Sequence, residues 1–151
     1  MAEVAIRKGK ESDLPVVLEL VKELAEYEKA LDEVDNTLER MKEDGFGAEP
    51  VFGFFVAEQG QQIIGLSLYY YRYSTWKGKR LYLEDLIVTE SERGKGIGKL
   101  LMDSTIQYAR DQNCSGMMWQ ALDWNEPALK FYETYGARFD SEWVNCHLDF
   151  E

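Results

Sequence analysis

A glycine-rich segment in the second half of the chain has the residue types of an anion-binding loop. It consists of Arg93, Gly94, Lys95, Gly96, Ile97, Gly98 and Lys99. Glycines let the backbone turn sharply and approach a ligand closely. A helix is predicted from Gly96 to Gln112, and its first free N–H groups and positive dipole end would point at that ligand. The segment therefore predicts a site for a pyrophosphate.

Two common phosphate-binding patterns do not fit this segment. A dinucleotide fingerprint would need a third glycine at position 99 or 101, where the chain has Lys99 and Leu101, and the Walker A spacing also fails. The pattern that is present is Arg-x-x-Gly-x-Gly, formed by Arg93, Gly96 and Gly98. A glycine-rich connection that binds no ligand is the alternative interpretation.

A second segment, Asp123 to Ala137, places an asparagine before a short predicted helix, Glu126 to Tyr135. Asn125 is suited to cap this helix. Tyr132 lies about two turns beyond Asn125. An aromatic side chain on a helix most often belongs to the core, so core packing is the alternative to a chemical role for Tyr132.

The elements that would position these segments follow from hydrophobic spacing and turn residues. Strands are predicted at Val4–Arg7, Phe52–Glu58, Ile63–Tyr73, Leu81–Val88, Met117–Leu122 and Trp143–Phe150. Helices are predicted at Ser12–Tyr27, with Ser12 as N-cap and Pro15 in the first turn, at Thr37–Glu43, closed by Asp44 and Gly45, and at the two positions given above. The order predicts a single mixed α/β domain over residues 1–151, with antiparallel hairpins in the middle and a parallel component later.

Composition narrows the class of protein. The 151 residues are 45% hydrophobic, enough for a buried core, and the formal net charge is −11. An acidic surface repels phosphate backbones, which argues against nucleic acid as a partner, and it attracts cations. No apolar stretch approaches the roughly 18 residues that span a bilayer, and no signal peptide is visible, so we expect no membrane association and a cytoplasmic protein.

Both segments resemble motifs of the GNAT acetyltransferases. Arg93, Gly96 and Gly98 are similar to that family's acetyl-CoA pyrophosphate loop, which also joins a fourth strand to a third helix. The run from Asn125 through Ala128, Phe131 and Tyr132 to Gly136 and Ala137 is similar to the pattern after its fifth strand. The resemblance implies a central, mixed, mostly antiparallel twisted sheet flanked by helices. It also implies acetyl-CoA as cosubstrate and no metal ion.

Further segments resemble the diamine (spermidine/spermine N1-) acetyltransferase group, and its thialysine branch in particular. They are Leu24–Lys29, Asp44–Gly47, Tyr73–Gly78, Tyr82–Asp85 and the Leu-Asp-Trp-Asn stretch ending at Asn125. Polyamine-specific members have an acidic residue where this chain has Ser74. The resemblance therefore implies a small primary amine as acceptor: thialysine, a lysine-like diamino acid, a diamine or a polyamine.

The resemblance also implies roles for individual residues. Tyr132 would face the sulfur of CoA as proton donor, and Glu84 would be the base. Backbone contacts to acetyl-CoA would come from Leu86, Ile87 and Val88, with the pyrophosphate at Arg93 to Lys99 and the pantetheine arm at Asn125, Glu126, Pro127 and Ala128. The amine site would be lined by Tyr27, Glu28 and Glu84, with Trp76 and Asp85 close by.

Elementary chemistry agrees with an acidic amine site. An alkylamine has a pKa near that of lysine, about 10.4, so it arrives protonated and must lose a proton before it can attack. Glu84 can accept that proton, directly or through water, while Glu28 and Asp85 can neutralise the ammonium. By period-two spacing Glu84 would share a strand face with Tyr82, Leu86 and Val88. A solvated surface position is the alternative for Glu28.

Other features bear on mechanism and assembly. The single histidine, His147, lies in a predicted strand, and nothing near Cys114 in the sequence marks it as a nucleophile, so direct transfer is favoured over an acyl-enzyme. A non-catalytic acetyl-CoA-binding sensor is the alternative function, and the presence of both Glu84 and Tyr132 favours the enzyme. The family resemblance and the aromatic residues from Tyr69 to Trp76 predict a homodimer.

Overall fold

The computed structural model describes residues 3–150 of the chain. Internal contacts divide the chain into two compact units, Met1–Trp119 and Gln120–Glu151, and each unit is described by itself. The single domain predicted over residues 1–151 stays a prediction. Within the described residues, no helix is both long and apolar enough to cross a membrane.

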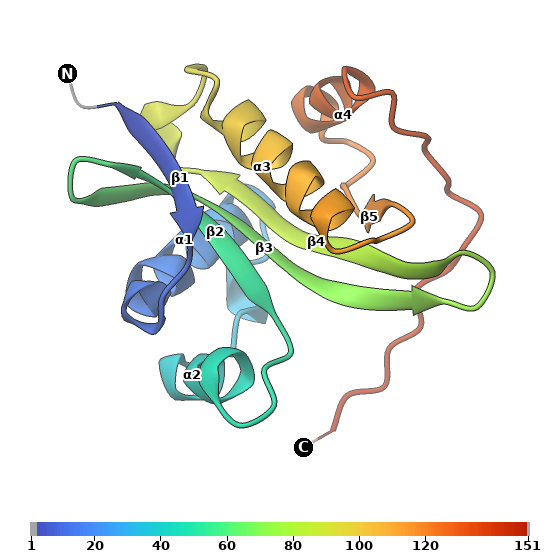
Figure 1. Ribbon diagram of the computed structural model, residues 1–151, viewed down its shortest axis with the longest axis horizontal. Coiled ribbons are helices and arrows are strands. Elements are labelled where there is room, and N and C mark those ends of the chain that lie inside the picture. The colour runs from blue at the N-terminus through green and yellow to red at the C-terminus, as the bar shows by residue number, and fades with distance from the viewer. Residues whose placement is uncertain (1–2, 151) are drawn as a thin grey trace. The chain divides into compact units, whose positions relative to one another are not determined.

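The first unit is built on a five-stranded sheet (Figure 1). Its strands are β1 (Val4–Lys8), β2 (Gly53–Gln59), β3 (Gln62–Ser74), β4 (Gly78–Val88) and β5 (Met117–Trp119), and they lie in the order β1-β2-β3-β4-β5. The first three pairs are antiparallel and the β4–β5 pair is parallel. The predicted mixed, mostly antiparallel sheet is therefore confirmed.

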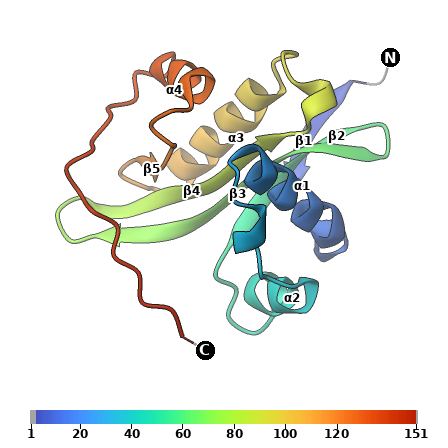
Figure 2. The same cartoon turned by 180° about the vertical axis from the view of Figure 1, so that it is seen from behind.

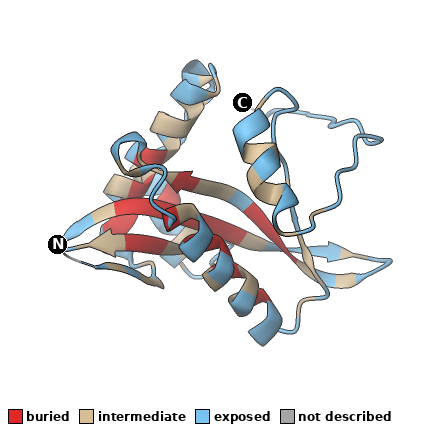
Figure 3. Cartoon of the chain, turned by 90° about the horizontal axis from the view of Figure 1, so that it is seen from above, coloured by how far each residue is buried: buried red, intermediate tan, exposed pale blue. Residues whose placement is uncertain are grey.

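Helices cover both faces of this sheet. The first unit contains α1 (Leu14–Tyr27), α2 (Leu38–Phe46) and α3 (Ile97–Asp111), with short 3-10 turns at Glu11–Asp13, Leu31–Glu33 and Glu90–Glu92. Figures 1 and 2 view the sheet from opposite sides and show α3 on one face and α1 and α2 on the other. The buried residues concentrate along the strands between these helices (Figure 3).

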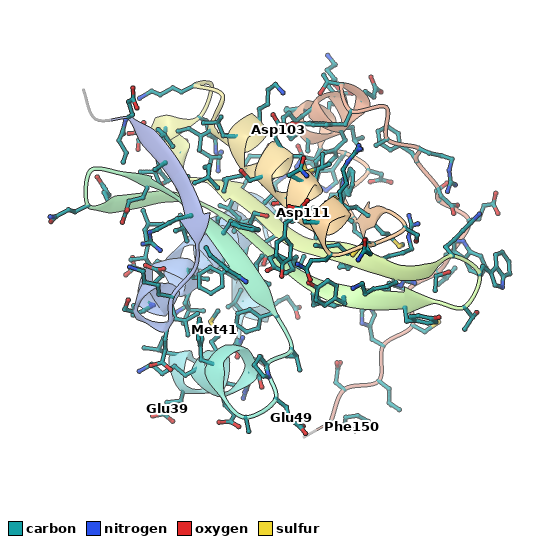
Figure 4. All side chains as sticks on the ribbon, viewed as in Figure 1. Glu39, Met41, Glu49, Asp103, Asp111 and Phe150 are labelled. Carbon is teal, nitrogen blue, oxygen red and sulfur yellow. The ribbon has the colours of Figure 1, made fainter. Side chains whose placement is uncertain are left out.

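Side-chain alternation along the strands explains the two layers. On the α1 face, Val56, Leu66 and Ile87 pack with Leu14, Val17 and Leu20 of α1, and with Met41, the buried residue of α2 (Figure 4). On the other face, Ala57 and Ile64 pack with Ile97 and Leu101 of α3. A buried hydroxyl pair, Ser67 and Thr105, joins β3 to α3 at 2.5 Å, so the polar atoms within this core are satisfied.

The start of α1 differs from the prediction. Ser12 does not cap it, because a 3-10 turn precedes the helix and the N-cap position is Asp13. The Asp13 carboxylate instead accepts the Lys10 backbone N–H at 2.7 Å and two N–H groups of Arg7 at 2.8 and 3.0 Å. Arg7 holds the pKa of Asp13 below its usual range, and this ion pair ties β1 to the helix start.

Two other boundaries also differ. Gly45 lies inside α2, which starts after Thr37 and ends before Gly47, with the Arg40 N–H donating to Thr37 Oγ1 at 3.1 Å. Strand β5 stops at Trp119, short of the predicted Leu122, because its pairing with β4 ends at Leu83 and Trp119.

The second unit contains the helix α4 (Glu126–Glu133), close to its predicted bounds. The strand predicted at Trp143–Phe150 is wrong, because residues 143–150 form no hydrogen-bonded ladder. Alternating side chains predict which residues could share a face, but a strand also needs a partner, and the described part of this unit contains none.

Candidate acetyl-transfer site

The centre of the site is a β-bulge in β4. Tyr69 of β3 pairs with Leu83 and the preceding residue, Leu68, pairs with Asp85, so Glu84 is one extra residue on β4. A bulge bends its strand and re-aims the side chains beside it. The β4–β5 pairing ends at the same point, at Leu83 and Trp119. Beyond it, Leu86, Ile87 and Val88 pair with β3, and the sheet provides no partner for their other edge.

The bulge corrects the predicted faces of β4. Leu86 and Val88 pack toward Ile97 and Leu101 of α3, whereas Glu84 lines a cavity on the α1 face. Glu84 therefore does not share a face with Leu86 and Val88, because the extra residue shifts the alternation by one position.

An acidic cavity of about 280 Å³ lies beside the bulge. Its carboxylates are Asp44 of α2 and Glu84 and Asp85 of β4. The remaining lining residues are Leu18, Val21, Asn36, Met41, Val51, Phe52 and Leu68, most of them apolar. An apolar wall with a few carboxylates fits an alkyl chain that carries positive charge. Among the described residues, no group of three or more His, Cys, Asp or Glu side chains could hold a metal ion.

Electrostatics connect three of the predicted site residues. Burial, and then the nearby charges of Glu84 and Glu28, raise the pKa of Asp85 to about 7. Burial also raises the pKa of Glu28, which follows the end of α1. The fold thus brings Glu28, Glu84 and Asp85 within electrostatic reach of one another, and a cation among them would relieve their repulsion.

Tyr27 and Trp76, predicted for the same amine site, lie elsewhere. The Arg93 guanidinium lies 5.3 Å from the centre of the Tyr27 ring, so Tyr27 faces the glycine loop. Trp76 is 87% exposed at the tip of the β3–β4 hairpin. The tip begins at Gly78, six residues from Glu84, which is about 20 Å at roughly 3.3 Å per residue. One chain therefore does not bring Trp76 to the cavity.

The glycine loop has the backbone that a phosphate site requires. Gly94 and Gly96 both have φ of +80°, a region that favours glycine, and the space where each would carry a Cβ is open. Gly96 is the N-cap of α3, which continues for 15 residues. The N–H groups of its first turn have no acceptor within the helix. The loop therefore leaves open space beside the positive end of a helix, where an anion could approach the backbone.

The cations of this loop already have partners. The Arg93 Nε donates to the Val88 carbonyl at 3.0 Å. Lys95 pairs with Glu92 at 2.7 Å, and Lys99 pairs with Asp103 at 2.9 Å (Figure 4 labels Asp103 on α3). These exposed pairs are weak, so an incoming phosphate could take over either lysine at little cost.

In the second unit, Asn125 caps α4 as predicted. Its side-chain oxygen accepts the Ala128 N–H at 3.3 Å, and Pro127 occupies the first turn after Glu126. Tyr132 lies on this helix, with its ring 5.7 Å from that of Phe131. Its predicted role as proton donor stays a prediction.

Sequence reasoning missed two residues of the site. Asp44 was interpreted as part of a helix end and of a segment that resembles the diamine acetyltransferase group, but it was not predicted to line the cavity, as it does. Glu23 of α1 was not singled out, yet it accepts hydrogen bonds from Thr89 and Glu90 at the start of the glycine loop. Its spacing of four from Tyr27, which places both on one side of the helix, was the available signal.

The raised pKa of Asp85 predicts a pH-dependent stability. Between pH 4 and 7 the unfolded chain ionises this carboxyl while the folded chain keeps it protonated, so Asp85 lowers the free energy of unfolding as pH rises and the loss levels off above 7. Asp85→Asn should be more stable than wild type by about 1–3 kcal/mol at pH 8 and similar at pH 4, as measured by urea unfolding. Asp35→Asn, at a side chain that is 97% exposed, is the control and should differ by less than about 0.5 kcal/mol at both pH values. An Asp85→Asn difference that is the same at both pH values would contradict the assignment.

The chain is similar to several known acetyltransferases. Thialysine N-epsilon-acetyltransferase of Sus scrofa is 43% identical, over 97% of this chain and 91% of that protein. Spermidine/spermine N(1)-acetyltransferase-like protein 1 of Homo sapiens is 36% identical over 95% of this chain, which corresponds to 22% of its own length. Among solved structures, an aminoglycoside acetyltransferase from an uncultured soil metagenomic sample has a similar fold, with a TM-score of 0.79 at 21% identity over 98% of this chain and 97% of that chain.

The family model described as the acetyltransferase (GNAT) family matches residues 17–137, which include the bulge, the glycine loop and α4. The chain therefore belongs to the GNAT family and is an N-acetyltransferase.

Proposed function

We propose that this enzyme transfers the acetyl group of acetyl-CoA to a primary amine of a small molecule that carries a second polar or cationic group. Thialysine and other lysine-like diamino acids are the favoured acceptors, ahead of diamines and polyamines. The observation that carries the proposal is the cavity beside the bulge, where Asp44, Glu84 and Asp85 line an otherwise mostly apolar wall. The name of the Sus scrofa relative supports the same choice of acceptor.

The carboxylates of the cavity, together with the roles that the family resemblance implies for Glu28 and Tyr132, support a direct transfer. Acetyl-CoA supplies a thioester, whose carbonyl carbon accepts the amine nitrogen while the carbon–sulfur bond breaks. Glu84 takes the proton that the ammonium must lose, and Asp85 and Glu28 stabilise the cation until then. Tyr132 donates its phenolic proton to the departing thiolate, and the proton that the nitrogen loses on becoming an amide restores the phenol by way of water, so that the products are the acetylated amine and the free thiol of CoA.

The cosubstrate would extend along the glycine loop and β4. The open backbone at Gly94 and Gly96 and the first turn of α3 suit the pyrophosphate. The edge of Leu86, Ile87 and Val88 that has no partner in the sheet offers backbone groups to the amides of the pantetheine arm. The turn from Asn125 to Ala128 is proposed as a second pantetheine contact.

The assembly and the compartment stay predictions. Tyr73 and Trp76, at 74% and 87% exposed, are large aromatic side chains at one hairpin, which supports the predicted homodimer. The cytoplasmic location rests on the sequence alone.

Thialysine should be a better substrate than spermine. In one chain Ser74 lies at the hairpin tip with Trp76, about 20 Å from Glu84, so it would meet the far end of a polyamine only from the partner copy of the predicted homodimer. It provides no charge there, and its hydroxyl instead accepts the N–H groups of Trp76 and Lys77 at 3.2 and 3.0 Å. We expect kcat/KM for thialysine to exceed that for spermine by about fivefold or more, since one ion pair contributes roughly 1 kcal/mol. The measurement is thiol release from acetyl-CoA with thialysine, lysine, putrescine, spermidine and spermine.

Ser74→Asp is the matched variant for this comparison, because aspartate can form the same local turn while adding charge. Ser74→Asp should lower the ratio of kcat/KM for thialysine to kcat/KM for spermine. Equal or better turnover of spermine by the wild type would contradict the proposed acceptor, and no thiol release with any amine would favour the sensor.

Gly96→Glu should abolish acetyl-CoA binding, because it places bulk and negative charge in the open space beside the pyrophosphate. Gly60→Glu is the control: Gly60 also has positive φ, at 65°, and open surroundings, but it lies in the β2–β3 turn. Calorimetry should show binding for wild type and Gly60→Glu only. Unchanged affinity in a folded Gly96→Glu variant would refute the loop assignment.

Tyr132→Phe should lower kcat and kcat/KM together by about 10²–10⁴ and leave KM nearly unchanged, since a missing general acid acts on the transition state. Tyr135→Phe, three residues farther along, is the control and should keep its kcat. Wild-type kcat in Tyr132→Phe, with chemistry shown to be rate-limiting, would exclude Tyr132 as the acid.

A further inference from the structure

A side chain from α1 holds the segment that leads into the glycine loop. The Glu23 carboxylate accepts the Thr89 hydroxyl at 3.1 Å and the Glu90 backbone N–H at 3.0 Å, both through the same oxygen. Thr89 is the N-cap of the 3-10 turn Glu90–Glu92, which leads directly into Arg93. Glu23 therefore supplies the cap that the loop does not supply for itself, because the Thr89 side chain makes no capping bond.

A second contact from the same side of α1 reaches the other end of this turn. Tyr27 follows Glu23 by four residues, and its ring faces the Arg93 guanidinium at 5.3 Å. Arg93 in turn donates to the Val88 carbonyl. The segment from Val88 to Arg93 is thus folded back on itself and fixed to α1 at both ends.

The partners of Glu23 matter for the charge of the loop. Glu23 bonds to a hydroxyl and an amide, not to a cation, in a segment that already contains Glu90 and Glu92. The bond therefore fixes backbone position without neutralising Arg93, Lys95 or Lys99. Another acid in an acidic segment adds repulsion, so its value lies in geometry more than in net charge.

We propose that Glu23 is a positioning residue that holds the pyrophosphate loop in its binding conformation. The proposal rests on the assignment of acetyl-CoA to this loop. Without the hydrogen bonds to Glu23, the loop would be ordered in only a fraction of the free molecules. The apparent affinity for acetyl-CoA would then be the intrinsic affinity multiplied by that fraction.

Three variants test this proposal, with calorimetry of acetyl-CoA binding as the readout. Glu23→Ala removes both bonds and should weaken the Kd by about 5- to 20-fold. Glu23→Gln keeps an acceptor oxygen and should stay within about threefold of wild type. Glu19→Ala should bind as wild type. Glu19 is an exposed glutamate one turn earlier, and with Glu23 and Thr89 it lines a second cavity, of about 490 Å³, separate from the amine cavity.

Two further measurements separate positioning from general stability. In the free protein, Glu23→Ala should speed hydrogen exchange at the Glu90 amide, which is the donor to Glu23, while Tm changes little. With both substrates saturating, kcat should stay within about twofold, since Glu23 acts through the loop. Should Glu23→Ala fail to fold, Thr89→Val removes only the hydroxyl donor and should still weaken binding by about two- to fivefold.

The outcomes distinguish this proposal from the proposed function. A wild-type protein that does not bind acetyl-CoA refutes both. A wild-type protein that binds, with unchanged Kd in folded Glu23→Ala or in Thr89→Val, refutes the positioning role alone. Equal losses in Glu19→Ala and Glu23→Ala would also refute it, because the effect would then come from the charge of that cavity.

Discussion

One extra residue in β4 governs the geometry of this enzyme. Opposite Leu68 and Tyr69 the strand carries three residues, Leu83, Glu84 and Asp85, and the sheet cannot continue regularly past that point. Pairing with β5 stops there, which leaves one edge of Leu86, Ile87 and Val88 without a partner in the sheet. The same irregularity directs two consecutive carboxylates toward one cavity, which a regular strand with alternating faces could not do. The proposed acceptor and cosubstrate sites thus adjoin because of a single bulge in β4.

The two proposed sites would bind ligands of opposite charge, a cationic amine and an anionic pyrophosphate, on a chain with a net charge of −11. The proposed amine cavity would use the negative charge of the chain, close to the carboxyls of Asp85 and Glu28, whose pKa values burial raises. To hold the proposed pyrophosphate, the glycine loop would have to attract an anion to this acidic chain, and backbone N–H groups at the start of α3 would contribute at least as much as side chains. Its lysines are held by Glu92 and Asp103 in short surface pairs, which keeps opposite charge close to the loop.

Local patterns predicted most of the fold. Two short-range features of the sequence predicted elements close to those observed: the helical spacing of Leu14, Val17 and Leu24, and the turn glycines at positions 60 and 78. Both glycines have positive φ in the structure. The bulge at Glu84 was not predictable in this way, because it exists only in the register between β3 and β4. The same limit explains two wrong predictions. Ser12 does not cap α1, because Asp13 occupies the N-cap position and pairs with Arg7. Residues Trp143–Phe150 alternate between apolar and polar side chains, but they have no strand partner among the described residues. In the candidate site, the glycine loop was predicted from its residue types and their spacing before a helix. The positions of Asp44 and Glu23 depend on contacts between segments that are distant in the sequence, so local patterns could not predict them.

The position of Asp85 has a consequence for proton accounting. With a pKa of about 7, this carboxyl is roughly half protonated in neutral solution. A bound ammonium group beside it would favour its anion, so the arrival of the substrate would expel a fraction of a proton to the solvent. The observed heat of amine binding would then contain the ionisation heat of the buffer, and the affinity would rise with pH as long as the amine stays charged. Ionisation of Asp85 would thus offset part of the positive charge that the amine brings into the cavity.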